Sequence, residues 1–130
     1  MPKVIRAWAG LDLLVTAVLA LPPTALWFID MLYQVNGLLG ATASPPTFAA
    51  VHLLFVCLMG GLGVVWAMAR LTRPSAFLGR LDGWARLWVA GLILYFILTA
   101  HAPLALYLFV ASELLGGLHQ LWVLRGVADQ

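Results

Sequence analysis

Glu113 is the residue whose position most requires a chemical explanation. It lies near the midpoint of an apolar segment, residues 103–125, that is long enough to cross a bilayer as one helix. An ionised acid at the centre of a membrane helix costs roughly 2.5 to 3.5 kcal/mol on insertion scales, so this carboxyl should face other helices, pair with a cation or stay protonated. The functional interpretation is a carboxyl that binds a proton or a cation. The structural alternative is a neutral or hydrogen-bonded acid that fixes neighbouring helices.

Two further polar side chains are placed to act with Glu113. Gln120 shares its helix face through Gly116 and Gly117, because offsets of three, four and seven residues align on an α-helix. Tyr95 lies in the preceding apolar segment at the expected level of Glu113, so we expect its hydroxyl to reach the carboxyl. This face is polar and small, which predicts that it is buried between helices.

Asp12 and Arg86 form a second candidate constellation. Asp12 lies about two turns into the first apolar segment, and Arg86 begins the third at a similar depth. Pairing would neutralise both charges, in competition with Asp82, which precedes Arg86 by the four residues typical of a helical ion pair. The structural interpretation is a lock between helices. The alternative is a cytoplasmic gate or a site for a lipid headgroup.

His52 and His101 are the candidates for a haem or a metal. They lie near the outer ends of the second and third apolar segments, and two imidazoles at one level can ligate either group. The pattern lacks a repeated His spacing within a helix, so interfacial hydrogen bonding is the preferred interpretation. The single cysteine excludes an intrachain disulfide and a CxxC motif. We therefore expect no cofactor.

Composition indicates a membrane protein. Of the 130 residues, 64% are hydrophobic and only 9% are charged, which leaves too little polar surface to cover a water-soluble globule. The sequence contains no nucleophile elbow, HExxH or P-loop, so catalysis by this chain is not expected. Its basic residues do not form the patch with interleaved aromatic residues that nucleic-acid binding requires.

The apolar segments predict an all-α four-helix bundle in the membrane. The expected crossings are residues 4–31, 47–69, 83–100 and 103–125. The first is interrupted at Pro22-Pro23, where we favour one continuous, kinked crossing. The alternative is a short crossing that ends at Leu21, followed by a surface helix over 23–39. Asp82 is expected to cap the third crossing, and the turn at 101–103 predicts an antiparallel hairpin of the third and fourth.

The distribution of basic residues predicts the orientation. Four crossings place all seven Lys and Arg residues on one side of the membrane, and this side should be the cytoplasm. Both termini are then cytoplasmic, and the basic-inside design is typical of a bacterial inner membrane. The seven residues are Lys3, Arg6, Arg70, Arg73, Arg80, Arg86 and Arg125.

The stretch Glu113-Leu-Leu-Gly-Gly-Leu, with Gly126 beyond it, resembles the acidic-glycine helix of DoxX-like proteins, which are small four-helix bacterial inner-membrane proteins. This resemblance implies a compact four-helix membrane protein. It also implies an association with redox or stress systems, mostly without a defined activity.

Three functions are consistent with these patterns. The first is a non-catalytic module that acts as a homo-oligomer or as an accessory subunit of a membrane complex, with the glycines from Gly60 to Gly63 as its contact face. The second is a small proton- or cation-coupled transporter or channel, whose polar route is lined by Glu113, Gln120, Tyr95 and Asp12. The third is a haem- or quinone-binding protein that uses His52 and His101.

Overall fold

The computed structural model describes residues 1–128, and their regular secondary structure is entirely helical. This confirms the all-α class. The α-helices are α1 (Pro2–Leu19), α2 (Pro22–Leu38), α3 (Ala50–Thr72), α4 (Ala76–Ala100) and α5 (Tyr107–Leu124), and a short 3₁₀ helix, η1 (Leu104–Leu106), precedes α5.

Three segments of the described chain are long and apolar enough to cross a membrane by themselves. They are α3, α4 and the continuous segment of η1 and α5. The pair of α1 and α2 provides a fourth if the two helices are taken together. The protein is therefore a multi-pass membrane protein.

The chain turns sharply between α1 and α2. Leu21 is extended, and Pro22 and Pro23 occupy the start of a new helix, where the missing backbone N–H would have had no partner within the helix. The axes of α1 and α2 differ by 105°. The predicted crossing over 4–31 is therefore not one continuous helix with a kink, because its two halves are separate helices, α1 and α2.

The third crossing begins earlier in the sequence than predicted. Helix α4 starts at Ala76 rather than at residue 83, because Ser75 caps it by accepting a hydrogen bond from the backbone N–H of Leu78 at 3.2 Å. Gly79 does not break the helix and is buried within it. Asp82 lies inside α4, so its predicted role as a cap is wrong.

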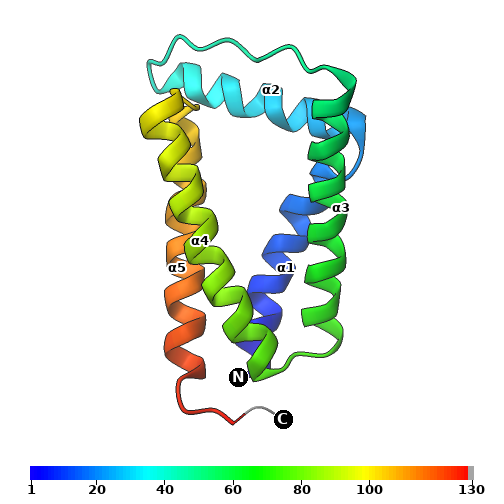
Figure 1. Ribbon diagram of the computed structural model, residues 1–130, viewed down its shortest axis with the longest axis vertical. Coiled ribbons are helices and arrows are strands. Elements are labelled where there is room, and N and C mark those ends of the chain that lie inside the picture. The colour runs from blue at the N-terminus through cyan, green and yellow to red at the C-terminus, as the bar shows by residue number, and fades with distance from the viewer. Residues whose placement is uncertain (129–130) are drawn as a thin grey trace.

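The helices form two antiparallel pairs, α1 with α3 and α4 with α5 (Figure 1). The two pairs meet at the end of the molecule that holds both termini and separate towards the other end, which α2 crosses (Figure 1). The predicted hairpin of the third and fourth crossings is confirmed as α4 and α5. The predicted four-helix bundle is not confirmed; the helices form two pairs that are joined at one end.

Glycines bring the two helices of each pair into backbone contact. A Cβ atom on Gly60 would lie 2.5 Å from the backbone N of Ala20, and one on Gly117 would lie 2.8 Å from the carbonyl oxygen of Gly83. A Cβ atom on Gly63 would instead meet the side chain of Thr16. Of the glycine face of α3 that was expected to contact another subunit, Gly60 and Gly63 are thus covered by α1 of the same chain, whereas Gly61 is not.

We predict that Gly60→Leu separates α1 from α3. The new side chain would meet the backbone at Leu19 and Ala20, and overpacking of this kind costs about 1–3 kcal/mol. Gly61→Leu is the matched control, because a Cβ atom at Gly61 meets nothing within 4 Å. Thermal unfolding in detergent should show a lower melting temperature for the first variant. Equal melting temperatures for the two variants would contradict the packing.

Candidate functional site

Five charged side chains from four helices meet where the two helix pairs join. We refer to them as the charged cluster: Asp12 of α1, Arg70 of α3, Asp82 and Arg86 of α4, and Glu113 of α5.

Arg86 contacts all three carboxylates of the charged cluster. Its Nε donates to Asp82 Oδ2 at 2.9 Å, and its Nη1 lies 3.2 Å from both carboxylate oxygens of Glu113. Its Nη2 donates to Asp12. The guanidinium has its donors in a fixed planar fork, so one side chain can hold three acids in defined directions. Arg86 thereby links α4 to both α1 and α5.

Arg70 supplies the second cation. Its Nη2 donates to Asp12 Oδ2 at 2.6 Å, and its Nη1 lies 2.6 Å from Asp82 Oδ2. The first contact stays within the α1–α3 pair, whereas the second crosses to α4. The Arg70–Asp82 and Arg86–Asp12 contacts together join the two helix pairs through opposite charges.

Neutral side chains complete the surroundings of Asp82. The amide Nε2 of Gln120 donates to Asp82 Oδ2 at 2.7 Å, and the indole Nε1 of Trp66 donates to Asp82 Oδ1 at 2.8 Å. The guanidinium carbon of Arg70 lies 5.4 Å from the centre of the Trp66 ring, within range of a cation–π interaction. Asp82 is therefore held by two cations and two neutral donors.

Burial differs across the charged cluster. Arg70, Asp82 and Arg86 are almost fully buried, with exposed fractions of 0%, 3% and 3%. The side chains of Asp12 and Glu113 are each 19% exposed. These two carboxylates therefore form the accessible part of the charged cluster.

The charges of the cluster do not balance. Three carboxylates face two guanidinium groups, so the cluster carries one net negative charge when all five are ionised. An uncompensated charge is costly at low dielectric constant, and a bound proton or cation removes it.

A cavity of about 180 Å³ opens onto the two accessible carboxylates. We call it the acidic cavity; its lining residues are Leu11, Asp12, Val15, Thr16, Phe109, Ser112 and Glu113. The hydroxyl of Thr16 donates to the carbonyl of Asp12 at 2.7 Å, and that of Ser112 donates to the carbonyl of Phe109 at 3.1 Å. Since these hydroxyl hydrogens are used, the polar side chains of the cavity offer acceptor oxygens only.

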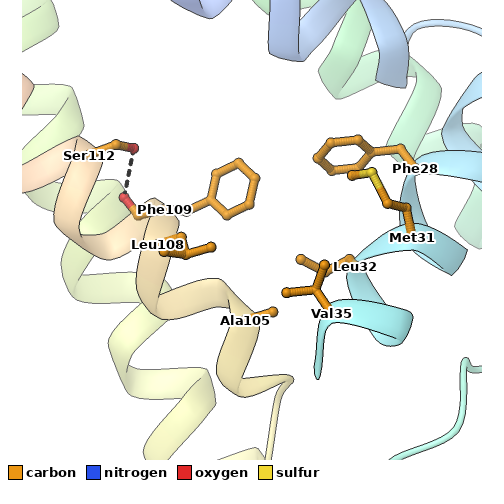
Figure 2. Close-up of a pocket in the computed structure, with 8 residues that line it drawn as sticks. All are labelled: Phe28, Met31, Leu32, Val35, Ala105, Leu108, Phe109 and Ser112. Carbon is orange, nitrogen blue, oxygen red and sulfur yellow. Dashed lines mark hydrogen bonds between the residues drawn. The ribbon is translucent and has the colours of Figure 1, made fainter. Parts of the chain in front are cut away.

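A second cavity, of about 250 Å³, lies between α2 and α5 and is apolar apart from Ser112 (Figure 2). We call it the apolar cavity; its lining residues are Phe28, Met31, Leu32, Val35, Ala105, Leu108, Phe109 and Ser112. Phe109 and Ser112 line both cavities, so the apolar space adjoins the acidic one.

Comparison with protein-family models, curated proteins and solved structures finds no match. The resemblance to DoxX-like proteins therefore stays a prediction, and the argument for function rests on the geometry of the site.

Several sequence predictions for this site are confirmed. Asp12 pairs with Arg86, and Asp82 pairs with the same arginine at the predicted four-residue spacing. Gln120 is fully buried, as expected for the small polar face of its helix, and it contacts the charged cluster through Asp82.

The predicted contact between Tyr95 and Glu113 is wrong. Gly83 packs against Gly117 where α4 and α5 touch, so Glu113 lies level with about residue 87 of α4. Tyr95 is eight residues further along, about 12 Å at 1.5 Å per residue, and its side chain is largely exposed. The prediction failed because it needed the register of the α4–α5 hairpin, which the contact of Gly83 with Gly117 sets.

His52 and His101 lie at opposite ends of α2. The start of α3, which carries His52, lines a cavity with Pro22, whereas His101 lines another cavity with Asn36. A helix of 17 residues spans about 25 Å, so the two imidazoles do not share one ligand. No three His, Cys, Asp or Glu side chains within residues 1–128 are arranged to hold a metal ion.

Arg70 was missed as a site residue because it was assigned to a loop. Helix α3 extends to Thr72, three residues beyond the predicted end, and this extension draws Arg70 inside. A signal was available in the sequence. Trp66 and Arg70 are four residues apart, as are Asp82 and Arg86, so each pair lies on one helix face.

We predict that Arg86→Gln destabilises the protein by about 3–5 kcal/mol, because it leaves buried carboxylates without their main cation. Arg125→Gln, at an exposed arginine that contacts only the ring of Trp122 among the described interactions, is the control and should change stability little. Unfolding in detergent, followed by circular dichroism, measures both. Adding Asp12→Asn to Arg86→Gln should recover part of the loss, since it removes one unpaired charge. Purely additive effects would contradict the pairing.

Proposed function

We propose that this protein is a small membrane transporter that exchanges a proton or a monovalent cation at Asp12 and Glu113. The observation that carries this proposal is the acidic cavity, because the charged cluster has one carboxylate in excess and opens at these two acids. A proton or cation bound there neutralises the cluster, and its release restores the charge.

The incomplete hydrogen bonding of the cluster supports an exchanging site over a fixed clamp. Fully satisfied buried polar networks rigidify a core, and each unpaired buried donor or acceptor costs free energy. Arg70 Nε and Gln120 Oε1 are buried and lack a hydrogen-bond partner among the described residues. A network with spare donors and acceptors can rearrange when one carboxylate gains or loses charge.

The two helix pairs supply an element that such a change can move. The charged cluster connects α1–α3 to α4–α5, and the pairs separate beyond it (Figure 1). Neutralising Asp12 weakens its contact with Arg86 across this junction, which shifts the balance between closer and wider arrangements of the pairs. The contact of Glu113 with Arg86 lies within the α4–α5 pair, so Glu113 acts on the junction only through Arg86. Binding at the cavity is thereby coupled to opening.

For the membrane, we propose a bacterial inner membrane with both termini in the cytoplasm. Six of the seven Lys and Arg residues lie near helix ends on the side that holds the termini, as the positive-inside rule requires; they are Lys3, Arg6, Arg70, Arg73, Arg80 and Arg125. By length and composition α3, α4 and the segment of η1 and α5 can each cross alone, whereas α1 passes only together with α2. In the proposed topology α1 forms the fourth crossing and α2 lies along the opposite interface, where Trp27 and Tyr33 suit the headgroup region.

This orientation predicts the side from which introduced cysteines react. In a Cys57→Ser background, Ala128→Cys should be labelled by a membrane-impermeant maleimide only after the inner membrane is opened. Ser44→Cys, in the exposed connection after α2, should be labelled in intact spheroplasts. The reverse pattern would place the termini outside.

The non-catalytic accessory subunit is the second candidate function. Large apolar side chains remain exposed along α3, including Phe55, Leu62 and Val65, and they can contact either lipid or another membrane protein. The glycine face no longer supports this function, because α1 covers Gly60 and Gly63. The haem or quinone function is not supported, because His52 and His101 lie at opposite ends of α2.

The transport proposal predicts that Glu113→Gln abolishes ion flux. Purified protein in liposomes, with an imposed membrane potential and an internal pH dye, should show proton movement that this variant reduces to the level of empty liposomes. Asp30→Asn is the matched control, because Asp30 is an exposed carboxylate on α2 outside the charged cluster. Its flux should equal that of the unmodified chain.

Folding must be separated from function in this experiment. Each variant is compared by helical content and by elution volume, and Glu113→Asp keeps the charge with a shorter side chain and should retain part of the flux. If the unmodified protein moves neither protons nor Na⁺ or K⁺ while Glu113→Gln lowers the melting temperature, the carboxyl is structural. The accessory-subunit function then takes precedence.

A further inference from the structure

We propose that the acidic and apolar cavities together form a binding site for a lipophilic ammonium cation. The charged head would lie against Asp12 and Glu113, and the apolar body would lie between α2 and α5. This inference rests on the proposed function, since it names the substrate that Asp12 and Glu113 exchange for a proton.

The lining of the acidic cavity selects the charge of the ligand. Its polar side chains present carboxylate oxygens and the lone pairs of two hydroxyls whose hydrogens are already donated to backbone carbonyls. An ammonium group supplies donors and the missing positive charge together. An anion would meet the excess negative charge, and a neutral body would leave it uncompensated.

The apolar cavity selects the body of the ligand. In Figure 2 the rings of Phe28, on α2, and Phe109, on α5, lie at the cavity in an edge-to-face arrangement, with Met31 beside Phe28. The two ring centres are 6.1 Å apart at an interplanar angle of 78°. Aromatic edges and faces, with a polarisable thioether, suit an alkyl or aromatic group.

Phe109 and Ser112 connect the two parts of the site. Both residues line both cavities, and Glu113 follows Ser112 in the same helical turn. A cation held at Glu113 therefore also lies near the Phe109 ring, which can add a cation–π contact. The volumes of about 250 and 180 Å³ bring the combined space into the range of small-molecule sites.

The chemistry of the two cavities also distinguishes a small amphipathic cation from a lipid as the ligand. The apolar cavity is lined by α2 on one side and by η1 and α5 on the other. A lipid acyl chain that enters the apolar cavity has no group to compensate the acidic one. Charge complementarity thus favours a small amphipathic cation over lipid.

The test compares a cation with its neutral isostere. The protein in lipid nanodiscs is titrated calorimetrically with 4-phenylbutylammonium and with pentylbenzene, in which a methyl group replaces the ammonium, and empty nanodiscs are subtracted. We expect saturable binding of the cation only. Glu113→Gln should weaken it by about tenfold or more, and Phe109→Leu by about threefold to tenfold. Phe55→Leu, at an exposed phenylalanine of α3, is the control.

Each outcome decides between the two proposals. Equal binding of both compounds, or cation binding that Glu113→Gln does not change, would overturn the inference and leave an apolar cavity for lipid. No saturable binding, with proton flux intact and dependent on Glu113, would overturn the inference and keep the proposed function. Binding that depends on Glu113 and Phe109 without any ion or cation flux would support the binding site and refute transport.

Discussion

The ion pairs between the two helix pairs are the interaction on which the rest of the structure depends. Within each pair, glycines such as Gly60 and Gly117 allow backbones to touch, and this packing needs no charge. Between the pairs, the contacts of Arg70 with Asp82 and of Arg86 with Asp12 are the main polar bridges. They place opposite charges at membrane depth, where each charge alone would be costly.

This joint has two consequences for function. It concentrates the interactions between the pairs at one end, so the helices diverge towards α2 and leave space beside α5. It also contains three carboxylates and only two guanidinium groups. Two of these carboxylates, Asp12 and Glu113, remain partly exposed. Asp12 therefore both joins the pairs, through Arg86, and remains partly exposed.

Only part of the site was predictable from the sequence, and the reason is the register between helices. Helical spacing placed Gln120 on the buried face and paired Asp82 with Arg86, because both inferences depend on local geometry. The contact of Tyr95 with Glu113 was wrong, because it required the register between α4 and α5 to within one turn. Arg70 was missed because α3 continues past the residue at which it was expected to end.

The sequence by itself determined that the protein is helical and built for a membrane, because apolar composition and segment length decide these properties without reference to neighbours. It also indicated that Glu113 and Asp12 need partners. Only the tertiary structure decided that the chain turns through 105° after α1, that the helices form two pairs, and that one cluster holds five charges. These features depend on contacts between residues far apart in the sequence, such as Asp12 and Arg86, which are 74 positions apart, and a local pattern does not encode them.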